Sequence, residues 1–251
     1  MEVHHHPDVE KKNFKEYFLE FIMIFLAVTM GFIAENIREN ISDNRQLHEY
    51  MQSMVSDLKS DEIMYDSAIS LNLIYCQMID TIFASLNQNT SNTGKIYYMA
   101  RKLTTGNYVI SPNAKTFGQM TSTGGLRFVR HQQIADSIAL YYQLIKMFDY
   151  WSDLQRQRVN DLIAVNDKLF DARVFFSVYK ALETTSNTGQ IIPQNNPPLI
   201  TNDPLVINTV LMRYQYFYGF LKLMNQRALL GLERSKRLII LLQKEYKINN
   251  E

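Results

Sequence analysis

The sequence predicts an all-α fold in which an N-terminal transmembrane helix continues into an antiparallel bundle of long helices. Apolar residues recur at steps of three and four through most of the chain, which is the spacing of a helix face. Nine glycines and six prolines in 251 residues are too few for a loop-rich β-sandwich. An apolar run near the N-terminus is long enough to cross a bilayer.

The charge balance and the cysteine count exclude several classes of protein. Lysine and arginine number 26 against 25 acidic residues, so the net charge of +1 argues against a nucleic-acid partner, whose phosphates need a basic surface. The single cysteine, Cys76, excludes an intramolecular disulfide framework and a cysteine-rich zinc module. We therefore expect no nucleic-acid partner and no cysteine-rich metal module, and no motif in the sequence predicts another metal or a cofactor.

The apolar run covers residues 17–34, and Glu20 is its only formally charged residue. As a helix it is about 27 Å long, close to the thickness of a hydrocarbon core. A cleaved signal peptide is disfavoured because the helical pattern continues past Glu35 without a small-residue cleavage site. A soluble core helix is disfavoured because a helix that is apolar on all sides needs a large protein around it. The run predicts an uncleaved anchor in a lipid bilayer.

The flanking charges predict the orientation of this anchor. Lys11, Lys12 and Lys15 precede the run, whereas Arg38 and Arg45 follow it in a comparable window. By the positive-inside rule, this bias predicts a cytoplasmic tail at 1–16 and an extracytoplasmic domain at 35–251. In a bacterium this places the C-terminal domain in the periplasm.

One face of the span carries small residues. Glu20, Ala27, Gly31 and Ala34 share this face at about 100° per residue. Small residues let helix backbones approach closely, and a carboxyl group within the span is a candidate for a partner contact. The face predicts a helix–helix contact with a second copy or with another membrane protein. Alternatively, Glu20 lies near enough to the boundary to reach the lipid headgroups.

The helical spacing continues beyond the span. No glycine or proline occurs between Ile33 and Leu86, which predicts one long helix that ends in a polar connection at 87–94. A short helix is expected at 95–103, followed by an irregular connection through 104–129.

Two further long helices complete the predicted bundle. The apolar period from Ile134 to Phe176 contains neither glycine nor proline, which predicts the second long helix. A proline-rich connection follows at 184–204, and Asp203 with Pro204 predicts an N-cap and first turn for the last helix. Methionines and tyrosines on the helix faces are expected to fill the core: Met51, Met54, Tyr141, Tyr214 and Met224.

The stretch from Ser122 to Leu126 stands apart from the helical pattern. Ser122, Gly124, Gly125 and Leu126 are typical of a turn in which glycine takes a positive φ and hydroxyls satisfy backbone groups. We interpret it as a structural corner. The alternative is an anion site in which backbone amides act with nearby arginines.

Catalytic and metal-binding patterns are not found in the sequence. A di-metal bundle needs a Glu-x-x-His motif on each of two helices, and the helical regions lack this pair. Acidic residues at helical spacing are interpreted as solvated helix faces, because no histidine stands near them. These pairs are Asp57 with Asp61, Glu62 with Asp66, and Asp149 with Asp153. No catalytic, metal-binding or cofactor-binding residue is predicted, and the protein is not expected to be an enzyme.

Several segments together carry a resemblance to a known family. They are the lysine-rich lead before the span, 18–32, 34–36, Phe117, 122–126, 134–138, and Tyr141 with Tyr142. These segments resemble a large family of uncharacterised single-pass membrane proteins from Gram-negative bacteria. The similarity covers roughly residues 10–146 and implies an inner-membrane anchor with a helical extracytoplasmic domain. It supplies no activity, ligand or catalytic residue.

These observations favour a noncatalytic, membrane-anchored interaction or scaffold protein, as an oligomer or as an accessory subunit of an envelope complex. The alternative is an extracytoplasmic ligand sensor that signals through a separate partner, because about sixteen residues before the span are too few for an output domain. An enzyme with a site assembled from scattered polar residues is the least favoured interpretation.

Overall fold

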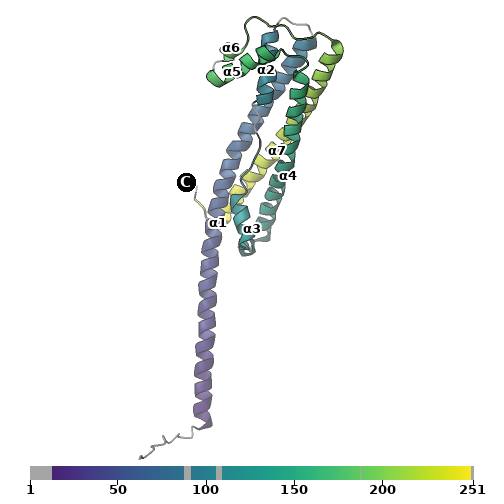
Figure 1. Cartoon of the computed structure of the whole chain (residues 1–251). Helices are drawn as coiled ribbons and strands as arrows, with labels where there is room; N and C mark the ends of the chain where they lie inside the picture. The colour runs from purple at the N-terminus through teal and green to yellow at the C-terminus, as the bar shows by residue number, and fades with distance from the viewer. Residues whose placement is uncertain (1–12, 88–91, 106–108, 187, 250–251) are drawn as a thin grey trace, which may run out of the picture. The chain divides into compact units, whose positions relative to one another are not determined.

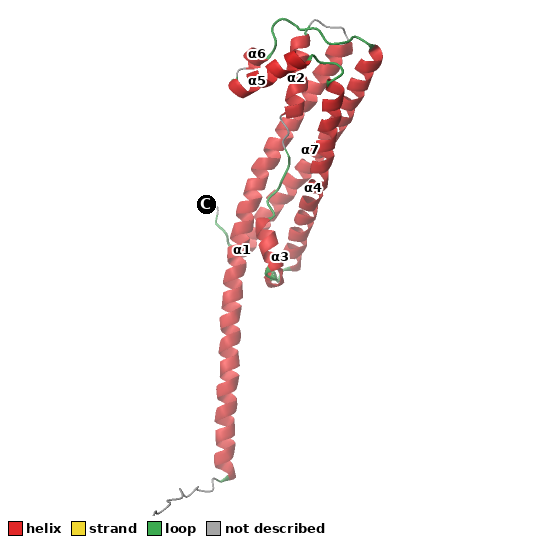
Figure 2. Cartoon of the chain, in the orientation of Figure 1, coloured by secondary structure: helices red, strands yellow, loops and turns green. Residues whose placement is uncertain are grey.

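The computed structural model describes residues 13–87, 92–105, 109–186 and 188–249. Within these ranges the chain forms helices and loops but no β-strand (Figure 2), which confirms the predicted all-α class. The chain divides into two units, Met1–Tyr50 and Met51–Glu251. Much of the predicted 1–16 tail and part of the 87–94 connection lie outside the described residues.

Helix α1 runs from Phe14 to Asn87 and is the only helix of the described ranges that belongs to both units. It contains no proline, and Gly31 is its only glycine, so nothing in its sequence interrupts the backbone hydrogen bonds. The Thr29 hydroxyl donates to the Phe25 carbonyl at 2.8 Å, which satisfies this polar group within the apolar run.

Three long helices build the second unit: α1 from Met51 onward, α4 (Gln132–Asn166) and α7 (Pro204–Tyr246). Their facing stripes form one core. The methionines and tyrosines expected in it are indeed buried. The largest fully buried side chains are Tyr65, Tyr97, Tyr141, Tyr142, Tyr214, Phe148, Phe217, Met51, Met54, Leu58, Ile79 and Ile82.

Helix α7 runs antiparallel to α4 (Figure 1). The Tyr214 hydroxyl, early in α7, donates to Asn166 Oδ1 at the end of α4, at 2.9 Å. Arg234, late in α7, donates from Nη1 to the Leu140 carbonyl near the start of α4, at 2.8 Å. The two contacts pair opposite ends of the helices, as an antiparallel bundle requires.

Helix α4 runs parallel to the second part of α1. The Tyr141 hydroxyl lies 2.6 Å from Asp61 Oδ2, and the rings of Phe148 and Tyr65 lie 5.9 Å apart. Residue numbers therefore increase in the same direction along both helices. Because α1 and α4 run in the same direction, the chain between them must return along the bundle. This return segment includes α2 (Thr93–Thr105), the non-helical residues 109–114 and α3 (Lys115–Ser122).

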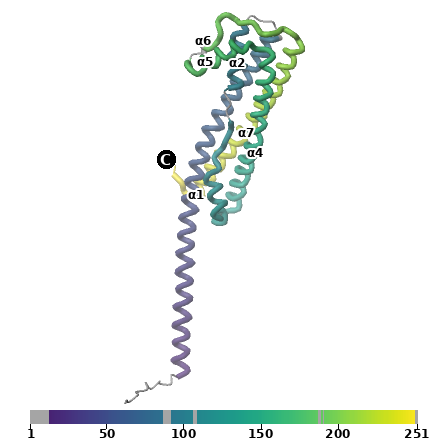
Figure 3. The backbone as a smooth tube through the Cα atoms, viewed as in Figure 1, coloured from purple at the N-terminus to yellow at the C-terminus, as the bar shows by residue number. Residues whose placement is uncertain are grey.

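The expectation that residues 104–129 are irregular was wrong in part. Helix α3 and the 3-10 turn η1 (Gly125–Phe128) lie within this range, and the described residues before α3, 109–114, form no helix (Figure 3). Part of the cause lies outside the segment. The carboxylate of Asp57 in α1 accepts hydrogen bonds from Thr116 in the first turn of α3, while Asn113, just before α3, accepts the N–H of Lys115 at 3.0 Å.

The second long helix is also shorter than predicted. It ends at Asn166, and a separate helix, α5 (Ala172–Thr184), follows. Asp171 is the N-cap of α5 and accepts the backbone N–H of Arg173 at 2.8 Å. Leu169 and Phe170, in the turn between the helices, are both buried. This capped and buried turn breaks the period although it contains neither glycine nor proline.

The last connection ends as predicted. The Asp203 side chain accepts the N–H of Leu205 at 2.9 Å, and Pro204 occupies the first turn of α7. Within the connection, a single helical turn, α6 (Thr188–Ile191), follows α5. The Tyr97 hydroxyl of α2 links this connection to the start of α5. It donates to the Pro198 carbonyl at 3.0 Å and accepts the Asp171 N–H at 2.8 Å.

Candidate functional site

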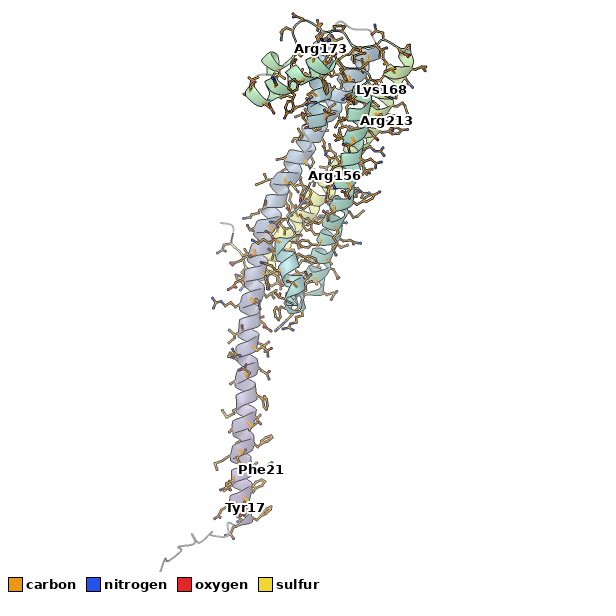
Figure 4. All side chains as sticks on the ribbon, viewed as in Figure 1. Tyr17, Phe21, Arg156, Lys168, Arg173 and Arg213 are labelled. Carbon is orange, nitrogen blue, oxygen red and sulfur yellow. The ribbon has the colours of Figure 1, made fainter. Side chains whose placement is uncertain are left out.

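The first part of α1 carries an apolar segment long enough to cross a membrane. It is the only such helix among the described residues, and none of its most apolar window is buried within the chain. Large side chains therefore stand in the open, as Figure 4 shows for Tyr17 and Phe21. Phe32, near the other end of the run, is 69% exposed. Such a surface is costly in water and favourable in lipid.

The four residues of the predicted contact face all lie on this segment. Ala27, Gly31 and Ala34 are exposed, and Glu20 is half-exposed. A Cβ atom added at Gly31 would meet no atom within 4 Å. The face is thus open within the chain, and its contact with a partner helix stays a prediction.

The second predicted feature, the corner, joins α3 to η1. Gly124 has φ 72° and is the only described glycine with a positive φ. The Ser122 hydroxyl donates to the Gln119 carbonyl at 3.0 Å, and the Gly124 carbonyl accepts the N–H of Arg127 at 3.2 Å. Gly125 is buried, and Leu126 is half-buried. Local hydrogen bonds among these residues hold the turn.

We expect Gly124→Val to lower the free energy of unfolding by on the order of 1–3 kcal/mol, because a β-branched residue is strained at positive φ. Arg127→Ala should be much milder, since its guanidinium only lies over the Phe128 ring. Gly118→Ala in α3 is the matched control, because an added Cβ meets no atom within 4 Å there. Thermal melting measures all three. A loss at Gly118 equal to that at Gly124 would contradict the role of φ.

The structure corrects the interpretation of Asp57 and Asp61 as solvated. Asp61 is only 2% exposed, and Asp57 is half-buried. Asp61 Oδ1 accepts the backbone N–H of Asn113 at 2.7 Å, and its Oδ2 accepts the Tyr141 hydroxyl at 2.6 Å. The two oxygens thus join three separate segments of the bundle, namely α1, the stretch before α3, and α4.

Asp57 lies one turn before Asp61 on α1 and serves the same stretch. Its Oδ1 accepts the Asn113 side-chain amide at 2.8 Å. Its Oδ2 accepts both the backbone N–H and the hydroxyl of Thr116, at 3.1 and 2.6 Å. Because these donors lie at the start of α3, the carboxylate caps that helix from a distant part of the chain. We call Asp57, Asp61, Asn113, Thr116 and Tyr141 the carboxylate junction.

Burial dominates the electrostatics of the carboxylate junction. It raises the pKa of Asp61 to about 6, although the Tyr141 hydroxyl and the Asn113 N–H favour the ionised form and lower it. The negative charge of Asp57 raises this pKa further. Burial also raises the pKa of the hydroxyls of Tyr65, Tyr141 and Tyr142, so they remain protonated, and Tyr141 donates to Asp61.

Two hollows lie near the end of the bundle that holds α2 and α5. The smaller has a volume of about 220 Å³ and is lined by Ser85, Leu86, Thr93, Ile96, Pro198, Leu199, Asn202 and Ile207. The more open one, of about 500 Å³, is lined by Tyr98, Lys102, Ile191 and the end of α5 with the residues after it. Neither hollow brings three metal-binding side chains together, and no such group occurs among the described residues.

The basic side chains labelled in Figure 4 lie in the same half of the bundle. Most of them are paired with acidic neighbours. Arg213 lies 3.8 Å from Asp161, Arg156 pairs with Asp153, and Arg173 lies 3.5 Å from Asp171. This half of the bundle therefore presents mixed charges, not a uniformly basic surface.

No family model, curated protein or solved structure matches the chain. The resemblance to single-pass inner-membrane proteins stays a prediction.

Proposed function

We propose that this protein is a noncatalytic interaction or scaffold protein anchored in the bacterial inner membrane. In this proposal the first part of α1 crosses the bilayer, and the helical bundle lies in the periplasm. The observation that carries it is the apolar segment of α1, none of whose most apolar window is covered by the rest of the chain. Lipid supplies the apolar surroundings that such a segment needs.

The polar side chains inside the bundle support a structural role over a catalytic one. The buried and half-buried carboxylates hold elements together: Asp57 caps α3, Asp61 joins α1 to α4, and Asp171 caps α5. The partner in this proposal is a second copy of the chain or another membrane protein, which packs on the face with Gly31.

A thiol probe that cannot cross the inner membrane tests the proposed topology. The native Cys76 is buried and is first replaced by serine. In cells whose outer membrane admits the probe, a cysteine at Asn195, which is exposed in the last connection, should be labelled. A cysteine at position 12 should be labelled only after the inner membrane is opened.

Two outcomes would contradict the proposal. Labelling at position 12 but not at Asn195 in intact cells would reverse the orientation. Release of the full chain from membranes by alkaline carbonate would show that α1 does not span the bilayer, because a transmembrane helix resists this extraction.

A further inference from the structure

We propose that the carboxylate junction is a proton-operated latch, which fixes residues 109–116 to α1 when Asp61 holds a proton and loosens when that proton is lost. The latch is a property of the bundle and does not depend on the proposed anchoring. Its parts come from three segments that are distant in sequence, so opening it would separate α3 from α1 and α4.

The stretch before α3 depends on the junction for its position. Residues 109–114 form no helix or strand of their own. Asn113 is tied to α1 twice, through its backbone N–H to Asp61 and through its side-chain amide to Asp57. Thr116, at the start of α3, adds two further hydrogen bonds to Asp57 and is only 2% exposed. Both carboxylates thus act on the same short segment.

Groups from three segments surround Asp61. Burial and the negative charge of Asp57 favour its neutral form, whereas the Tyr141 hydroxyl and the Asn113 N–H favour the ionised form. On α1 the surrounding groups are the like charge of Asp57 and the buried hydroxyl of Tyr65. On α4 they are the hydroxyls of Tyr141 and Tyr142, which are uncharged. The segment before α3 contributes the N–H of Asn113.

On α7, the guanidinium of Arg234 donates to the carbonyl of Leu140, the residue before Tyr141. Gly231 is the α7 residue that faces Tyr65, and the positive charge of Lys236 acts on Glu62 instead. Lys59 of α1 likewise acts on Glu62. The ionised Asp61 is therefore held by two hydrogen bonds, beside a like charge and away from water.

A proton on Asp61 fits the hydrogen bonds already present. With the proton on Oδ2, Asp61 donates to the Tyr141 oxygen, and the Tyr141 O–H turns toward the neighbouring Tyr65 hydroxyl. Oδ1 remains an acceptor for the N–H of Asn113. The junction keeps its contacts and loses a buried charge.

The sign of the pH dependence follows from linkage. The Asp61 pKa is raised from 3.8 to about 6 in the closed junction, so the closed form binds the proton more tightly than the open form. Closure is therefore strongest in acid and weakens as the pH rises from about 4 to 6, then levels off. Between pH 5 and pH 8 the opening equilibrium should rise about tenfold.

Hydrogen exchange of the full chain in mild detergent measures the latch. After correction for intrinsic exchange, protection of the amides of Asn113 and Thr116 should fall about tenfold from pH 5 to pH 8. Amides in the middle of α4 serve as the reference and should change much less. Asp61→Asn keeps an acceptor for Asn113 and a polar contact for Tyr141, and it should abolish the pH dependence.

Two other variants keep the test decisive. Tyr141→Phe removes a donor that favours the ionised Asp61, so it should move the transition to higher pH. Asp136→Asn, at an exposed position of α4, should leave the profile unchanged. The latch is overturned if wild-type protection at Asn113 does not vary between pH 5 and 8, if Asp61→Asn keeps the dependence, or if α4 changes in step with the junction.

Discussion

Gly231→Ala is expected to lower the free energy of unfolding of the bundle by about 2–4 kcal/mol. A Cβ atom at this position of α7 would lie 2.5 Å from Cζ and 2.8 Å from the hydroxyl oxygen of Tyr65. Tyr65 is fully buried, and its ring packs against Phe148 at 5.9 Å, so it cannot move aside without disturbing the core between α1, α4 and α7.

Gly219→Ala in the same helix is the matched control. An added Cβ there meets no atom within 4 Å. Because alanine stabilises a helix more than glycine does, this variant should raise the free energy of unfolding by about 0.5–1 kcal/mol. Denaturant unfolding in detergent compares the two variants. Combining Gly231→Ala with Tyr65→Leu should recover part of the loss, because the smaller side chain frees the space. Equal effects at positions 219 and 231 would contradict the close α1–α7 contact.

The sequence predicted the elements whose signals are local. The three long helices follow from apolar residues at helical spacing, and the start of α7 follows from Asp203 and Pro204, which are adjacent in the chain. The apolar run at the start of α1 is also a local property. A partner for its open face is not, because one chain carries only half of such an interface.

Features that depend on distant residues were missed. Helix α3 was missed within 104–129 because only one of its caps, Asn113, is local. The other is the Asp57 carboxylate, more than fifty residues earlier. The burial of Asp61 did leave a signal. Leu58, Asp61 and Tyr65 are spaced by three and four, so Asp61 occupies the core stripe of α1. An acidic residue in that stripe indicates a buried hydrogen-bonded group, not a solvated face.

The break between α4 and α5 shows a third kind of limit. Its turn contains neither glycine nor proline, and Leu169 and Phe170 are apolar like the helix residues before them, so the sequence shows no interruption there. What ends α4 is tertiary, because the Tyr97 hydroxyl of α2 accepts the N–H of Asp171 at 2.8 Å and both apolar side chains are buried. Asp171 was the only local signal, as an N-cap for α5.

Gly31→Leu is expected to abolish assembly of the full chain if the span packs on a partner helix through the face with Glu20, Ala27 and Ala34. Lipid tails are as apolar as the side chains, so close backbone approach and polar contacts must hold such helices together. Leucine would separate the backbones and still leave the segment apolar enough to insert. The mass of the complex in mild detergent, measured by light scattering, reports the loss.

Two further substitutions separate the contributions to this contact. Phe25 lies about 160° from Ala27 around the helix, so Phe25→Leu should leave the mass unchanged. Glu20→Gln should weaken assembly if the carboxylate has a charged partner across the interface, and should have no effect if it reaches the headgroups. An unchanged mass for Gly31→Leu would exclude this face as the contact. Any oligomer that remained would then have to form through the bundle, where the same measurement on bundle-surface variants would locate it.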